Sequence, residues 1–311
     1  MTPKTSLATI SALALVAAQQ AQAFLPVTKH STRSQLTPWL SIANLASTSN
    51  SRLLAATDVT KIIPRLTTGQ LQELSTNGFI ILEDFLPKGL QNALREDIEQ
   101  LRQMGKFNVA KIGQDATNAL NTEIRVAETC FLGNAKLNDV PNTARSHLYK
   151  VLDQIRLDLP QQPLDANLSE LLYAYYPKGG FYRRHRDALP GSASTLRKVS
   201  LLMYLNSDWK EEDGGRLRLH MDSGGDVLPE GEQAAYLDVD PKGGTLVLFE
   251  SDRLAHEVLD TQSTRMAVVG WYNRPVTAGD LAELSGIGLS PVRILGLAVA
   301  AALVTVGLLN L

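Results

Sequence analysis

The chain carries two hydrophobic patterns, and the change between them falls near residue 168. Before it, apolar residues recur every three or four positions, which predicts amphipathic helices that bury one face. We expect a short helix from Thr68 to Gly78, a longer one between Pro87 and Gly105, and a third over roughly 143–157. A buried strand at 79–82 follows the first helix.

After residue 168, apolar runs alternate with Gly, Pro and Asp turns. They predict strands at 168–176, 197–205, 216–221, 244–249, 255–259 and 265–273, the last apolar on both faces and so covered on both. Closely spaced strands are typical of a sandwich or barrel. Helices followed by strands predict an α+β fold, a double-stranded β-helix (jelly roll) core with supporting N-terminal helices. Residues 106–135 lack a clear period and predict a long loop or finger.

The N-terminal region has the composition of a targeting sequence. An apolar run and the small-x-small sequence Ala21-Gln22-Ala23 predict a signal peptide over residues 1–23. Residues 24–59 are poor in acidic and rich in hydroxyl side chains, which indicates a transit-like segment or a disordered linker. The junction also resembles the Ala-Phe-Pro cleavage motif of algae with complex plastids. We therefore expect a plastid location, with the endoplasmic reticulum or secretory pathway as the alternative.

The C-terminal segment 294–311 contains no charged side chain and reaches the lower length limit of a membrane-spanning helix. It is a candidate membrane anchor; a helix docked on the domain and a cleaved lipid-anchor signal are the alternatives. The expected organisation between the ends is N-terminal helical support with the finger loop (60–150), the double-stranded β-helix core (151–275) and a linker (276–293).

Composition narrows the class of protein. The 311 residues are 44% apolar and 20% charged, which is typical of a globular protein with an adequate core. A net charge of -2 gives no basic field, so no nucleic-acid partner is expected. The single cysteine, Cys130, permits no internal disulfide, and we expect it to be a small buried side chain.

The candidate chemistry lies in the strand-rich half. His185 and Asp187 are two residues apart, so they share one face of an extended strand, and His256 comes near the end of the β core. Two imidazoles and one carboxylate form the facial triad of non-haem Fe(II), which leaves positions for substrate and O2. Arg265 suits a carboxylate cosubstrate, with the Tyr204 hydroxyl as a further donor. We therefore expect Fe(II) as the cofactor and 2-oxoglutarate and O2 as cosubstrates.

These residues stand in motifs that resemble the hypoxia-inducible-factor prolyl hydroxylases and their microbial relatives. The resemblance spans about residues 65–275 and rests on Tyr176-Pro177, Tyr182-Arg183-Arg184-His185-Arg186-Asp187, Tyr204-Leu205-Asn206, Gly214-Gly215-Arg216-Leu217, His256-Glu257-Val258 and the stretch from Arg265 to Trp271-Tyr272. It implies iron ligation by His185, Asp187 and His256, with 2-oxoglutarate contacts from Arg265 and Tyr204. It further implies that Tyr176 lies beside the cosubstrate, that Leu217, Val258 and Trp271 line the pocket, and that ascorbate serves as reductant.

The finger departs from the family pattern. The family carries Ile-Arg-x-Asp followed by tryptophan, whereas this chain has Ile124-Arg125-Val126-Ala127 and then Phe131. Because the resemblance implies that this loop closes over substrate, Arg125 and Tyr182 are the candidate substrate residues.

The leading functional hypothesis is hydroxylation of a prolyl residue in a protein or peptide, a peptidyl-proline or procollagen-proline type reaction that releases succinate and CO2. The first alternative is a hydroxylase of small molecules or lipids on the same fold. The second is a non-catalytic module that senses 2-oxoglutarate or oxygen.

Overall fold

The computed structural model describes residues 63–112, 119–133, 137, 139–166, 170–221, 235–277 and 279–280. The chain divides into two units, 1–48 and 49–311, and every described residue belongs to the second. The expected signal peptide, the segment 24–59 and the candidate anchor at 294–311 lie outside the described residues, as does most of the expected linker 276–293. Among the described residues, no helix combines the length and apolar character needed to cross a membrane.

The expected helices of the N-terminal half are present as α3 (Thr68–Asn77), α4 (Lys88–Gln103) and α5 (Thr143–Asp158). Local sequence explains their ends. A capping box between Thr67 and Gln70 begins α3, and Gly78 ends it in the left-handed conformation with φ +80°. The side chain of Asn142 accepts hydrogen bonds from two backbone amides at the start of α5.

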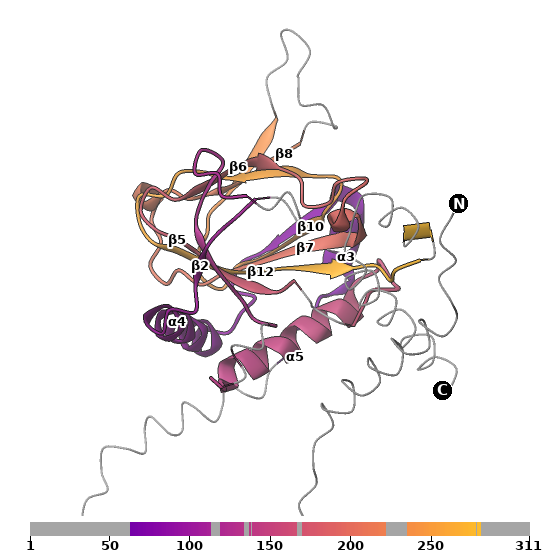
Figure 1. Ribbon diagram of the computed structural model, residues 1–311. Coiled ribbons are helices and arrows are strands. Elements are labelled where there is room, and N and C mark those ends of the chain that lie inside the picture. Colours follow the sequence, from indigo (N-terminus) through magenta and orange to yellow (C-terminus); the bar gives the residue numbers. More distant parts are fainter. Residues whose placement is uncertain are drawn as a thin grey trace, which may run out of the picture. The chain divides into compact units, whose positions relative to one another are not determined.

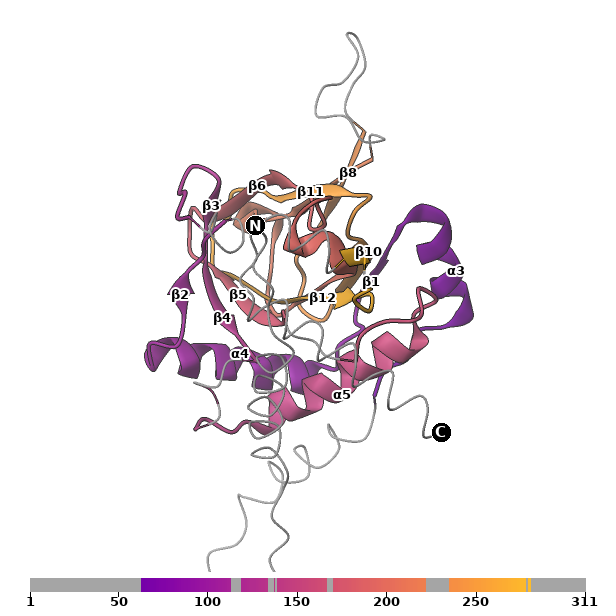
Figure 2. The same cartoon turned by 45° about the vertical axis from the view of Figure 1, so that its right-hand side comes forward.

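The strands form two mainly antiparallel sheets that face each other (Figures 1 and 2). The seven-stranded sheet has the order β1-β10-β7-β12-β5-β4-β2, and the five-stranded sheet has the order β3-β6-β11-β8-β9. Their bounds are β1 Phe79–Leu82, β2 Asn108–Val109, β3 Arg125–Val126, β4 Glu128–Phe131, β5 Leu172–Tyr176, β6 Phe181–His185, β7 Arg197–Tyr204, β8 Leu217–His220, β9 Tyr236–Val239, β10 Leu246–Glu250, β11 Ala255–Val258 and β12 Arg265–Asn273. This is the expected α+β double-stranded β-helix with supporting N-terminal helices.

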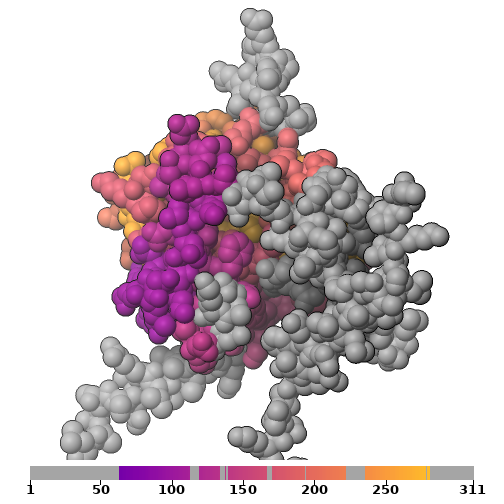
Figure 3. All heavy atoms as spheres, in the orientation of Figure 1, coloured from indigo at the N-terminus to yellow at the C-terminus, as the bar shows by residue number. Residues whose placement is uncertain are grey.

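The seven-stranded sheet is buried on both faces. Successive strand residues point to opposite faces, and in β12 Met266 and Val268 join the cluster that contains the buried residues of α4 and α5. Ala267, between them, joins a second cluster with residues of β8, which fills the space between the two sheets. Two covered faces explain why residues 266–272, between Arg265 and Asn273, are apolar on both faces of the strand, as expected. In the space-filling view the indigo-to-magenta N-terminal elements and the orange-to-yellow strands form one continuous surface (Figure 3).

The structure corrects the expectation of a long loop at 106–135. Within the described part of that segment, β2 pairs with β4 and β4 with β5 in the seven-stranded sheet, and β3 pairs with β6 in the five-stranded sheet. Strands of two to four residues are too short to show a period, so local pattern did not predict them. The strands β6 and β9 were also not among the expected ranges. Cys130 lies in β4 and is buried, as expected.

Candidate metal centre and its neighbours

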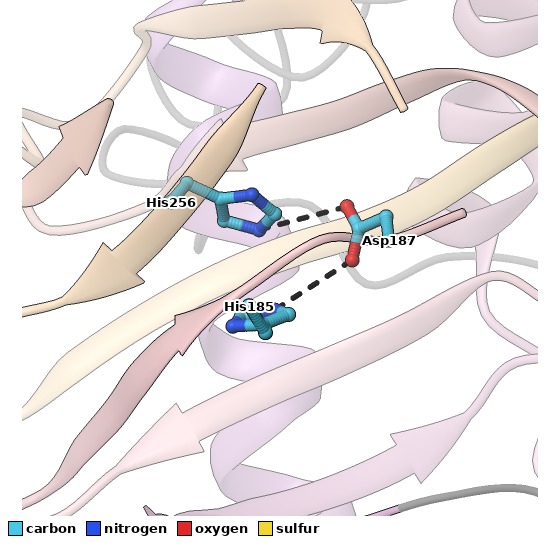
Figure 4. Close-up of side chains that lie close together, drawn as sticks. All are labelled: His185, Asp187 and His256. Carbon is cyan, nitrogen blue, oxygen red and sulfur yellow. Dashed lines mark ion pairs between the residues drawn. The ribbon is translucent and has the colours of Figure 1, made fainter. Parts of the chain in front are cut away.

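Three predicted ligand residues converge between the two sheets. His185 is the last residue of β6, Asp187 follows two positions later, and His256 lies in β11 directly opposite His185 in the strand register. One ligand atom from each residue lies within 4.8 Å of the others (Figure 4). Pairing of β6 with β11 therefore brings together side chains that are 71 positions apart in the chain.

Hydrogen bonds orient both imidazole rings. His185 Nδ1 lies 2.8 Å from the carbonyl oxygen of Arg183, and His256 Nδ1 lies 3.3 Å from that of Leu254. A carbonyl oxygen only accepts, so each neutral ring carries its proton on Nδ1 and keeps the Nε2 lone pair free. His185 Nε2 is 3.7 Å from Asp187 Oδ1, and His256 Nε2 is 3.6 Å from Asp187 Oδ2. Two nitrogen lone pairs and a carboxylate thus face one point, which fits a divalent cation.

The electrostatics favour the protonation state that binds metal. Burial lowers the pKa of His185 to about 3, and the neighbouring His256 adds to this effect. Burial alone would raise the pKa of Asp187, but His256, His185, Arg197 and the Ser200 hydroxyl outweigh it and lower the value to about 2. At neutral pH His185 is therefore uncharged and Asp187 is ionised.

The predicted substrate residues lie beside the triad because of an irregularity in β6. The register between β6 and β11 shifts after His256, so that Val258 faces Tyr182. A bulge of this kind re-aims side chains, and here Tyr182 stacks on His185 with ring centroids 3.7 Å apart. Arg125, opposite Tyr182 in β3, places its guanidinium carbon 4.5 Å from the centre of the tyrosine ring.

Arg265 forms a second polar group in the space between the two sheets. It begins β12 opposite Tyr176 of β5, and Tyr204 of β7 faces Ala267, two residues further on, so these side chains share one face. The Arg265 guanidinium carbon lies 4.9 Å from each of the two tyrosine ring centres. Its Nε donates to the carbonyl oxygen of Gly215 at 2.9 Å.

Two polar atoms of this group lack a hydrogen-bond partner. Arg265 Nη2 and the Tyr204 hydroxyl are both buried, and neither is hydrogen-bonded to any described residue. Burial raises the pKa of Tyr204 to about 12, although the Arg265 charge and the approach of the Arg265 side chain to the hydroxyl oppose the shift. A buried cation and a neutral hydroxyl without partners are unusual in a folded protein and are complementary to a ligand carboxylate. The pair therefore fits the distal carboxylate of 2-oxoglutarate.

The predicted apolar lining is in the same region. Leu217 of β8 and Val258 of β11 are directly paired and buried. Val258 clusters with Tyr176, and Trp271 packs against that cluster. Apart from Asp187, which follows β6, every residue predicted for the site thus lies on a strand of the two sheets.

Sequence reasoning missed three residues that hold Asp187. The Ser200 hydroxyl donates to its carboxylate at 2.7 Å, and Ser251 contacts Ser200 at 2.9 Å. Arg197 donates to the Asp187 backbone carbonyl oxygen at 3.0 Å and lies over the Trp271 ring. One signal for Ser200 was available, because it is the only hydroxyl residue in the otherwise apolar run from 199 to 203.

The strand-rich half of the chain is similar to a known family of proteins. Residues 171–273 match the family model of the 2OG-Fe(II) oxygenase superfamily. Egl nine homolog 1 of Homo sapiens is 26% identical over 202 residues, which cover 64% of this chain and 44% of that protein. The chain thus spans less than half the length of this relative.

Two solved structures share the fold. A prolyl-4-hydroxylase from Pseudomonas putida is 29% identical with a TM-score of 0.52, over 66% of this chain and 97% of that chain. A prolyl hydroxylase from Trichoplax adhaerens, solved with a peptide fragment of the hypoxia-inducible factor oxygen degradation domain, is 24% identical with a TM-score of 0.55, over 78% and 98% of the two chains. These similarities support a 2OG-Fe(II) oxygenase of the prolyl 4-hydroxylase type.

Proposed function

We propose that this protein is an Fe(II)- and 2-oxoglutarate-dependent dioxygenase that hydroxylates a prolyl residue in a protein or peptide, with release of succinate and CO2. One observation carries the proposal. The cluster of His185, Asp187 and His256 and the buried side chain of Arg265 both lie between the two sheets, and Arg265 Nη2 is not hydrogen-bonded to any described residue. A metal site alone is compatible with many functions, but a metal site and a buried cation between the same sheets fit a chelator that carries a carboxylate.

The proposed roles follow from these positions. His185, Asp187 and His256 would hold Fe(II), and Arg265 with Tyr204 would bind the distal carboxylate of 2-oxoglutarate. Bound together with O2, the metal and the keto acid supply the oxidising chemistry, in which one oxygen atom enters the C–H bond and the other enters succinate. The protein orients the reactants and excludes water, with Tyr176, Leu217, Val258 and Trp271 as the lining. Ascorbate is the proposed reductant that keeps iron in the Fe(II) state.

A prolyl substrate is supported by the similarity to the prolyl hydroxylases of Pseudomonas putida and Trichoplax adhaerens. Arg125 and Tyr182 would contact the peptide, since they stack on one another next to His185. A second candidate, a small apolar substrate, is favoured by the finger. Ala127 stands where the family has aspartate, and it is buried in an apolar cluster with Ala110 and other residues.

The test uses the full-length chain with Fe(II), ascorbate, 2-oxoglutarate and a proline-containing peptide library, and it records succinate and peptide mass together. Proline hydroxylation, seen as +16 Da and equimolar with succinate, supports the proposal. The matched control is His185→Ala, which removes one proposed ligand. Succinate without any modified peptide would favour the small-molecule alternative, and a chain that forms no succinate with either substrate class would refute the enzyme and favour the binding module.

The location in the cell is a separate proposal. We infer a plastid address from residues 1–59 and membrane attachment from residues 294–311, on composition alone. Fractionation of cells that express the full chain tests both, since a protein of the soluble secretory fraction would contradict them.

A further inference from the structure

Two buried serines connect the proposed ligand Asp187 to the body of the fold. Ser200 lies in β7 and Ser251 directly follows β10, with exposed fractions of 1% and 0%. Ser200 Oγ is 2.7 Å from Asp187 Oδ2 and 2.9 Å from Ser251 Oγ. The three side chains therefore form one continuous chain of hydrogen bonds.

The direction of this chain follows from the chemistry of its members. An ionised carboxylate only accepts hydrogen bonds, and each hydroxyl has a single proton to donate. Ser200 must use its proton on Asp187, so it accepts the proton of Ser251. Hydrogen bonds aligned in this way strengthen one another in a buried setting.

The backbone around Asp187 is fixed from the same side. The backbone carbonyl oxygen of Ser251 accepts a hydrogen bond from the amide of Ala188 at 3.0 Å. The backbone amide of Ser251 donates to the carbonyl oxygen of Lys198 at 3.1 Å. Arg197 donates to the carbonyl oxygen of Asp187 at 3.0 Å. Ser251 thus supports both the residue after Asp187, through its backbone, and the Asp187 carboxylate, through Ser200.

The two carboxylate oxygens of Asp187 are consequently not equivalent. Oδ2 is occupied by Ser200, whereas no described residue donates a hydrogen bond to Oδ1, which lies 3.7 Å from His185 Nε2. Oδ1 therefore keeps both of its lone pairs, whereas Oδ2, which lies 3.6 Å from His256 Nε2, uses one of them for the hydrogen bond from Ser200.

We propose that Ser200 and Ser251 are positioning residues of the metal centre, which hold Asp187 so that Oδ1 is offered to the metal. The inference rests on the proposed function, because it requires that the triad binds Fe(II). Groups that hydrogen-bond to a metal-ligating carboxylate typically change metal affinity about 10- to 100-fold when they are removed. A purely structural role would reduce stability and leave metal affinity intact.

The experiment measures metal binding without turnover. Full-length wild type and the variants Ser200→Ala, Ser251→Ala and Ser200→Thr are made metal-free and titrated anaerobically with Fe(II) in the presence of 2-oxoglutarate. The readouts are the Kd for Fe(II) and the visible charge-transfer absorption of the metal-bound keto acid. The control is Tyr272→Phe, which removes a buried hydroxyl that donates to Leu152 at 2.8 Å on the helix side of the sheet.

We expect Ser200→Ala to raise the Kd for Fe(II) about 10- to 100-fold and to shift the absorption band. Ser251→Ala should act in the same direction by less, because Ser200 keeps its bond to Asp187. Ser200→Thr, which retains a hydroxyl, should restore much of the affinity, and Tyr272→Phe should bind as wild type does. If Ser200→Ala does not fold, as judged by circular dichroism, the Kd of Ser251→Ala decides.

Alanine variants with the wild-type Kd and spectrum would overturn the inference. The same holds if Tyr272→Phe weakens binding as much as Ser200→Ala, because general loosening of the fold would then be sufficient. A wild-type chain that binds neither Fe(II) nor 2-oxoglutarate would instead refute the proposed function, so the two failures are distinguishable.

Discussion

Replacement of Tyr204 by phenylalanine should have two effects of opposite sign. The substitution removes one hydroxyl and keeps the aromatic ring that lies 4.9 Å from the Arg265 guanidinium carbon. The hydroxyl is fully buried; the Arg265 side chain approaches it, but no described residue makes a hydrogen bond of standard geometry to it. Without cosubstrate, the buried hydroxyl therefore lowers the stability of the folded protein. With cosubstrate bound, it is the proposed hydrogen-bond donor to the 2-oxoglutarate carboxylate.

Both magnitudes follow from this position. A buried polar group without a partner costs about 1–3 kcal/mol, so the ligand-free variant should gain stability up to that amount. For a domain of this size, each kcal/mol corresponds to roughly 2–4 °C in Tm. A hydrogen bond to a charged group contributes about 1.5–3 kcal/mol, so 2-oxoglutarate should bind roughly 10- to 150-fold more weakly. Since the pKa of Tyr204 is raised to about 12, the phenol is protonated and able to donate at neutral pH.

The assay combines thermal unfolding of the ligand-free chain with anaerobic calorimetric titration of 2-oxoglutarate onto the Mn(II)-loaded chain. Tyr272→Phe is the matched control, because its hydroxyl donates to Leu152 at 2.8 Å. That control should lose about 0.5–1.5 kcal/mol of stability and keep its affinity. If Tyr204→Phe is destabilised like the control and binds 2-oxoglutarate as wild type does, the assignment of the unpaired hydroxyl to the cosubstrate is wrong.

Three further predictions concern the metal, the cosubstrate and the single thiol. His185→Ala should abolish Fe(II) binding and turnover with an unchanged far-ultraviolet circular dichroism spectrum; retained turnover contradicts the site. Gly215→Ala should weaken 2-oxoglutarate binding but not metal binding, both measured by titration, because φ is +70° and a Cβ would lie 3.1 Å from Arg265 Cδ. The backbone strain should cost about 1–2 kcal/mol of stability. An unchanged affinity for 2-oxoglutarate would contradict this prediction. Burial raises the pKa of Cys130 to about 11, so a thiol reagent at pH near 8 should react only after denaturant is added; rapid reaction of the folded chain contradicts this.

The helices and the longer strands were accessible from the sequence because each contains several turns or alternations of its own pattern. In α4, Leu90, Leu94, Ile98 and Leu101 recur at helical spacing, and all four are buried. In contrast, β3 contains only Arg125 and Val126, and its existence depends on pairing with β6. Segments this short take their conformation from neighbours distant in the chain, so local periodicity carries no information about them.

Some features of the site were likewise predictable from local sequence, whereas others depend on the tertiary structure. Residue type and two-residue spacing predicted His185 and Asp187 as candidate ligands, because ligand chemistry restricts which side chains serve and strand geometry places alternate residues on one face. His256 and Arg265 were predicted from residue type and from their place near the end of the β core. The bulge that stacks Tyr182 on His185 could not be predicted, since it arises from the register of β6 against β11.

The hydrogen bonds that connect Ser251 and Ser200 to Asp187 show most clearly what the sequence alone could not predict. Ser200 and Ser251 are 51 positions apart, lie in β7 and directly after β10, and have no motif of their own. Their role depends on two strands, β7 and β10, being paired side by side and on both hydroxyls being sealed from water. The identity of a metal ligand is a local property of the chain, whereas the orientation of that ligand is a property of packing, and packing exists only once distant segments have met.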